Sequence, residues 1–142
     1  MKKMTNEECY KFISEGTRTG KIATVNKDGS PHVIPVWFVT DGEQIVFCTG
    51  VGSVKYKNML RDPRVSLAVD EETGLYSFAK IDGTVSFLTG TENSLKWSTD
   101  IARRYMGEEN ADAYGERNSG PDEVVVILKP TKILALADIA GW

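Results

Sequence analysis

The sequence predicts a mainly β domain with flanking helices (an α+β chain), folded as a small antiparallel barrel or sandwich. Two observations carry this prediction. Short segments with a two-residue hydrophobic period recur from residue 21 onwards, and helical spacing is confined to a few stretches between them. The length of 142 residues, with 41% hydrophobic and 26% charged residues, fits one globular domain over residues 1–142.

Three segments have helical patterns. Thr5 and Glu8 have the spacing of a capping box, which begins a short amphipathic helix that Gly16 can end. A second short helix is expected over Ser53–Arg61 and a longer one over Glu92–Met106. The expected apolar face of the longer helix consists of Trp97, Ile101, Ala102, Tyr105 and Met106.

Short β-type segments dominate the rest of the chain. They are Lys21–Val25, His32–Val39, Gln44–Thr49, Arg64–Val69, Lys80–Leu88, Glu123–Leu128 and Lys132–Ala137. Pro35 cannot donate a hydrogen bond to a neighbouring strand, so its strand must lie at an edge, carry a bulge or face a ligand. The polar, acidic residues 107–122 predict a surface loop.

Composition argues against several classes of protein. The net charge of −3 does not suit a dedicated nucleic-acid binder, and no apolar run approaches the length of about 20 residues that spans a bilayer. No secretory signal is recognised. Cys9 and Cys48 are too few for a disulfide scaffold or a four-cysteine zinc site, which predicts a reduced, cytoplasmic protein without a metal. His32 is the only histidine, so a histidine-based catalytic triad is not expected.

The segment from Cys48 to Asn58 contains the clearest chemical signal. Ser53 can cap a helix whose first turn carries Lys55 and Lys57 and no acidic residue, although a helix N-terminus favours negative charge. A phosphate bound between the lysines and the backbone N–H groups would explain this pattern, with the Thr49 and Ser53 hydroxyls as further donors. The alternative is a pair of ordinary solvated lysines. The spacing of a P-loop or of a dinucleotide fold is absent, which disfavours nucleotide hydrolysis.

Four segments taken in order extend this interpretation. They read Ala23-Thr24-Val25, Asp28-Gly29-Ser30-Pro31, Pro35-Val36-Trp37-Phe38 and Lys55-x-x-Asn58-x-x-Arg61-Asp62-Pro63-Arg64-Val65-Ser66-Leu67. This series resembles the pyridoxamine-phosphate-oxidase-like flavin-binding split-barrel family, with a weaker similarity in Val124–Ala137. The resemblance implies a six-stranded antiparallel split β-barrel and a homodimer with a cofactor in each of two clefts between the protomers. It implies FMN as the cofactor or, alternatively, the 8-hydroxy-5-deazaflavin coenzyme that some short members use.

The resemblance also implies which residues hold the cofactor. Lys55 matches the phosphate-binding lysine, and Ser53 matches a serine of the preceding loop. Cys48 and Thr49 match the strand end beside the flavin phosphate, and Val33–Phe38 matches the strand whose backbone lies beside the isoalloxazine ring. The implied cofactor-binding set is Val33, Ile34, Pro35, Val36, Trp37, Phe38, Cys48, Thr49, Ser53, Lys55 and Asn58.

Several departures from the family pattern argue against true pyridoxamine phosphate oxidase activity. Val54 replaces an arginine before the phosphate lysine, Val33 and Phe38 replace ring-side cations, and Phe78 replaces a ring-contacting glutamine. The carboxyl-terminal Arg-x-His-x-Arg motif is absent. The expected function is a flavin- or deazaflavin-dependent oxidoreductase acting on a small-molecule substrate, with no catalytic side chain identified. A non-catalytic flavin carrier and a haem-binding protein are the alternatives.

Overall fold

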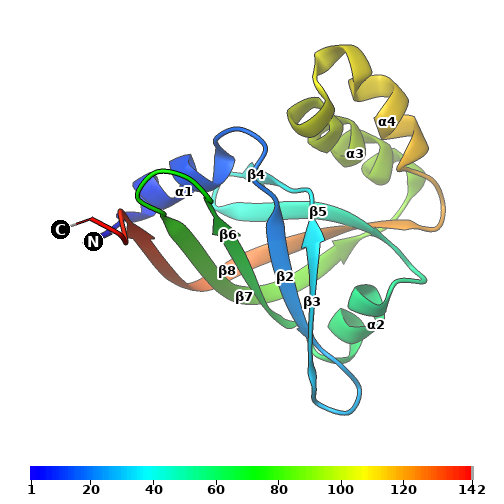
Figure 1. Ribbon diagram of the computed structural model, residues 1–142. Helices are drawn as coiled ribbons and strands as arrows, with labels where there is room; N and C mark the ends of the chain where they lie inside the picture. The colour runs from blue at the N-terminus through cyan, green and yellow to red at the C-terminus, as the bar shows by residue number, and fades with distance from the viewer. Residues whose placement is uncertain (142) are drawn as a thin grey trace.

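The computed structural model describes residues 1–141, which form one antiparallel sheet with helices at its edges (Figure 1). The strands are β1 (Lys2–Lys3), β2 (Gly20–Val25), β3 (Pro31–Val36), β4 (Val39–Asp41), β5 (Gln44–Gly50), β6 (Arg64–Asp70), β7 (Phe78–Leu88) and β8 (Glu123–Ala137). The helices are α1 (Asn6–Ser14), α2 (Val54–Arg61), α3 (Thr91–Met106) and α4 (Ala111–Arg117), with a 3₁₀ turn over Glu108–Asn110.

The sheet has eight strands, so the prediction of six was wrong. Seven strands follow the order β3-β2-β6-β7-β8-β5-β4, and β1 pairs with the end of β8. The predicted strand His32–Val39 divides into β3 and β4 because the chain leaves the sheet at Trp37 and Phe38. There, the Phe38 N–H donates to the Tyr105 hydroxyl, and Arg104 donates to the Phe38 carbonyl oxygen. These backbone groups of Phe38 are therefore not available to a neighbouring strand.

The two strands predicted near the carboxyl terminus are a single strand, β8. Pro130 does not end it, because the pairing with β7 shifts register there. Gly83 lies opposite Pro130 while Asp82 lies opposite Lys132, so Thr131 is the additional residue of a β-bulge. A bulge tolerates a proline that a regular central strand would exclude.

The core lies on the inner face of the curved sheet and is closed at one end by α1. Thr5 and Glu8 form the predicted capping box, with Glu8 N–H donating to Thr5 Oγ1 at 3.1 Å. Alternate residues of the strands fill the interior, as their two-residue period predicts. The largest fully buried side chains include Phe38, Phe47, Ile13, Ile22, Ile45, Met59, Leu67, Ile81 and Leu128.

Residues 107–122 do not form the predicted loop, because they contain α4, which packs against α3. A Cβ on Gly115 would lie 2.1 Å from Thr99 Oγ1, so the absence of a side chain allows the two helices to approach closely. The buried face of α3 confirms Ile101 and Ala102 of the predicted residues, but Ser94 and Ser98 complete it in place of Trp97, Tyr105 and Met106. Trp97 is instead half-buried, with Lys96 Nζ 3.6 Å from its ring centre. Between residues 1 and 141, no helix has the length and apolar character needed to cross a membrane.

We expect Gly83→Ala to reduce the free energy of unfolding by about 1–3 kcal/mol. A Cβ at this position would lie 2.3 Å from the Lys129 carbonyl oxygen, so the β7–β8 pairing must shift. Gly52→Ala is the matched control because open space surrounds that position. Urea denaturation of both variants measures the effect, and a Gly83→Ala protein as stable as the control would contradict this account of the bulge.

Candidate cofactor site

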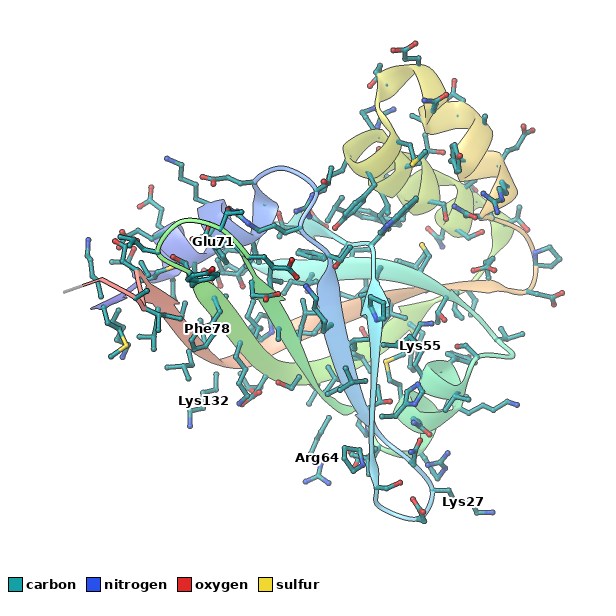
Figure 2. All side chains as sticks on the ribbon, in the orientation of Figure 1. Lys27, Lys55, Arg64, Glu71, Phe78 and Lys132 are labelled. Carbon is teal, nitrogen blue, oxygen red and sulfur yellow. The ribbon has the colours of Figure 1, made fainter. Side chains whose placement is uncertain are left out.

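A cleft of about 560 Å³ opens between β3, the end of β5, the start of α2 and the α3–α4 pair. Figure 2 shows Lys55 in the space between β3 and α2. The lining residues come from β3, β5, the start of α2, α3 and β8, and from the segments before β2 and after α4. They are Thr19, Pro35, Val36, Trp37, Cys48, Thr49, Gly50, Ser53, Lys55, Ser98, Ile101, Asn118 and Glu123.

One end of the cleft is built by the turn between β5 and α2. Ser53 caps α2, and its Oγ accepts a hydrogen bond from Tyr56 N–H at 3.2 Å. The same oxygen lies 2.8 Å from Thr49 Oγ1, so the two hydroxyls form a pair at the helix N-terminus. Since the first turn of α2 carries no acidic residue, this end of the cleft attracts an anion.

Lys55 adds a full positive charge to the same end. It is half-buried, and among residues 1–141 it takes part in no ion pair. Burial lowers the pKa of Lys55, and the nearby Glu123 carboxylate opposes that shift. Glu123 only partly balances the charge of Lys55. A bound anion would add negative charge beside Lys55 and would therefore favour its protonated form.

The side of the cleft formed by β3 is an open sheet edge. Within the described chain β3 pairs only with β2, so of the three possibilities that Pro35 allowed the structure shows an edge strand. Asn26 N–H donates to Ser30 at the hairpin end, and hydrogen-bonded pairs alternate along an antiparallel ladder. By this alternation the backbone groups of Val33 and Pro35 point away from β2. The edge therefore offers the N–H of Val33, which lies outside the cleft lining, and carbonyl oxygens from both residues, of which Pro35 lines the cleft.

Trp37 forms an aromatic wall where β3 ends. Its ring stacks on Tyr105 of α3, with ring centres 5.0 Å apart and planes within 5°. The Tyr105 hydroxyl donates to the Arg18 carbonyl at 2.9 Å and accepts from Phe38 N–H at 3.2 Å. Since these bonds fix the tyrosine, they also fix the orientation of the indole ring.

Arg104, the neighbour of Tyr105, holds the end of α3 against the barrel. Its guanidinium donates to the carbonyl oxygens of Ile13 at 2.7 Å, Gly16 at 3.0 Å and Phe38 at 2.7 Å. A fourth, longer bond runs to the Arg18 carbonyl at 3.4 Å. No sequence pattern predicted these contacts, since all the acceptors are backbone atoms. The cleft keeps its shape because α3 is attached at this end.

Seven of the eleven residues that the sequence predicted for a cofactor line the cleft together: Pro35, Val36, Trp37, Cys48, Thr49, Ser53 and Lys55. The other four do not line it. Val33 and Ile34 are exposed farther along β3, and the Phe38 side chain is fully buried in the core. Asn58 is also buried, and its amide donates to Thr24 Oγ1 at 3.0 Å. The role of each of the eleven toward a cofactor stays a prediction.

The structure adds cleft residues that the sequence did not single out. Ser98, Asn118 and Glu123 come from the α3–α4 side and from the start of β8. Ser98 Oγ donates to the Asn118 carbonyl at 2.9 Å, which ties α3 to the segment after α4. Burial raises the pKa of the neighbouring Cys48 thiol, and a hydrogen bond with Ser98 opposes the rise. On this side of the cleft the sequence had singled out Ile101, through its helical spacing, whereas Ser98, Asn118 and Glu123 carry no comparable signal.

The arrangement suits a particular ligand shape. One end supplies a cation, two hydroxyls and a helix N-terminus, while the other supplies an aromatic ring and a free strand edge. A flat molecule with an anionic tail matches both ends. Within residues 1–141 no three histidine, cysteine, aspartate or glutamate side chains gather to hold a metal ion.

Known structures show the same fold. A conserved hypothetical protein from Mycobacterium tuberculosis matches with a TM-score of 0.82 at 23% identity, over 95% of this chain and 86% of that one. A protein described as an F420 reductase matches with a TM-score of 0.71 at 25% identity, over 87% and 94%. A FAD-binding protein from Mesorhizobium loti matches with a TM-score of 0.70 at 22% identity, over 94% and 95%.

The family comparison covers nearly the whole chain. The model described as pyridoxamine 5'-phosphate oxidase matches residues 5–137. This range extends beyond the motif-bearing segments into α3, α4 and β8, which form the opposite wall of the cleft. The antiparallel architecture with its flanking helices and this match agree with the resemblance found in the sequence, and the chain belongs to the pyridoxamine 5'-phosphate oxidase family.

Proposed function

We propose that the protein binds FMN in the cleft beside Lys55 and acts as an oxidoreductase on a small-molecule substrate. The observation that carries the proposal is the half-buried Lys55, free of ion pairs within residues 1–141, beside the Thr49–Ser53 hydroxyl pair. A phosphate monoester fits this end of the cleft because it is doubly charged and accepts several hydrogen bonds.

The opposite end of the cleft fits a flat ring. At the open edge of β3 the Pro35 carbonyl oxygen can accept an in-plane hydrogen bond, and the indole of Trp37 offers a flat apolar surface. When bound, a flavin would supply hydride or electron transfer, while the protein would orient it and set its electrostatic surroundings. Thr49, Ser53 and Lys55 would hold the phosphate, and α3 would exclude water from one side of the site.

The 8-hydroxy-5-deazaflavin coenzyme is the alternative cofactor. The similarity to an F420 reductase at 25% identity supports it, whereas the similarity to a FAD-binding protein supports a flavin. Haem is less well supported, because no histidine is among the residues that line the cleft. A flavin carrier without turnover fits the same cleft, so a catalytic assay must separate it from an enzyme.

A homodimer and a reducing compartment complete the proposal. The cleft is open to solvent on one chain, and a second copy would cover a bound ring without hollowing out either core. Cys9 and Cys48 are both free thiols, which supports a cytoplasmic location.

Lys55→Ala should weaken FMN binding by about 1.5–3 kcal/mol, the scale of a hydrogen bond to a charged group. Lys57→Ala is the matched control: it removes the same charge from the same helix, but Lys57 is exposed and does not line the cleft. Quenching of flavin fluorescence measures both affinities. Equal FMN affinities of the two variants would show that Lys55 does not bind the phosphate.

Turnover should distinguish an enzyme from a carrier. We expect the bound cofactor to be reduced by NADH, NADPH or a reduced deazaflavin and then reoxidised by an added acceptor, both followed by absorbance. A cofactor that binds stoichiometrically but stays oxidised with every donor would favour the carrier.

The mass in solution tests the dimer. Light scattering at micromolar concentration should give twice the chain mass of 15.7 kDa. A mass of one chain, measured with the cofactor bound, would contradict a site completed by a second copy.

A further inference from the structure

Glu123 is a half-buried carboxylate placed against the predicted phosphate end of the cleft. It begins β8 directly opposite Gly50, the last residue of β5. Its Oε1 lies 3.6 Å from the point where a Cβ on Gly50 would stand, so it contacts the turn that leads to Ser53. An acidic group is unexpected where an anionic ligand is proposed to bind.

Glu123 and Lys55 line the same cleft, yet they do not form an ion pair in the described chain. Within residues 1–141 the carboxylate is influenced by burial and by nearby charges, with no hydrogen bond among the causes of its pKa shift. Lys55 and Glu123 are close enough to affect each other's pKa through charge. Neither side chain holds the other in place, because they form no ion pair. A ligand anion that approaches Lys55 also approaches Glu123.

The groups around Glu123 set its protonation. Lys55 faces it from α2, Cys48 from β5 and Asp122 from the preceding turn, while the α3 wall contributes the uncharged Ser98. Burial raises the pKa of Glu123; Lys55 opposes this rise, and Asp122 adds to it. A bound phosphate would offset the charge of Lys55 and add its own negative charge, so it would favour the protonated carboxyl further.

We propose that Glu123 partly offsets the charge of Lys55 in the free cleft without pairing with it, and that binding of a phosphate monoester is coupled to protonation of Glu123. This inference rests on the proposed function, because it assumes that the ligand phosphate lies beside Lys55. The proton comes from solvent and moves to a carboxylate oxygen, and no covalent bond to the ligand forms. By linkage, the protein with a neutral Glu123 binds the phosphate more tightly than the protein with a charged one.

The experiment compares FMN affinities of the wild-type protein, Glu123→Gln and Asp122→Asn by fluorescence quenching from pH 5.5 to 8.5. Asp122→Asn removes the same charge one residue away, from an exposed side chain that does not line the cleft. The second ionisation of the FMN phosphate is common to all three proteins, so it cancels in the ratio of their affinities. Riboflavin, which lacks the phosphate, is the ligand control.

At pH 8.5 we expect Glu123→Gln to bind FMN about tenfold more tightly than the wild-type protein, which corresponds to a shift of about one pKa unit on binding. This advantage should shrink toward pH 5.5, where the wild-type carboxyl is increasingly protonated. At pH 8.5 Asp122→Asn should bind FMN as the wild-type protein does, since an exposed charge is screened by solvent. Because Asp122 adds to the raised pKa of Glu123, its loss should only move the pH dependence slightly toward lower pH. Riboflavin should bind the wild-type protein and Glu123→Gln alike.

Three results would overturn the inference. Equal or weaker FMN binding by Glu123→Gln at pH 8.5 would do so while leaving the proposed cofactor site intact. An advantage that is independent of pH, or that extends to riboflavin, would assign Glu123 a packing role instead. Failure of all three proteins to bind FMN would overturn the proposed function and the inference together.

Discussion

The attachment of α3 by Arg104 is the constraint on which the cleft depends. One guanidinium binds carbonyl oxygens from α1, from the loop after it and from the turn between β3 and β4, which are distant in sequence. Each bond to a charged donor contributes more than a neutral one, and loss of the guanidinium would leave part-buried acceptors without a partner. Because Tyr105 follows Arg104 on the same helix, this attachment also fixes the position of the Tyr105 ring, on which Trp37 stacks at the end of β3.

Asn58 shows how a motif residue can serve a site without lining it. Its amide nitrogen donates to Thr24 Oγ1 and Asn26 Oδ1, and its oxygen accepts from Arg61 at 3.1 Å. These bonds attach α2 to the β2–β3 hairpin. Lys55 lies one helical turn earlier, so its position relative to the open edge of β3 is fixed through Asn58.

Local patterns were sufficient to predict the features that arise from near neighbours in the chain. The capping box at Thr5 and the cap of α2 at Ser53 follow from a few adjacent residues. Pro35 limited its strand to an edge, a bulge or a ligand-facing position, and the structure shows the edge. The β-bulge at Thr131 and the packing of α4 at Gly115 were not predictable, since each depends on a distant partner. The same holds for the α3–α4 wall, where Ser98 and Asn118 have no distinguishing pattern. The sequence thus predicted one side of the cleft and missed the other.

The free edge of β3 has a consequence for solubility. A long, regular edge strand invites strands of other molecules to add to it, which is how many proteins begin to aggregate. In β3 the outward positions alternate as Pro31, Val33 and Pro35, and two of these three residues have no N–H. Another chain could therefore form only a broken ladder there, whereas a compact ring needs only one or two backbone groups. The prolines thus leave the edge accessible to a small molecule and make it a poor template for fibril growth.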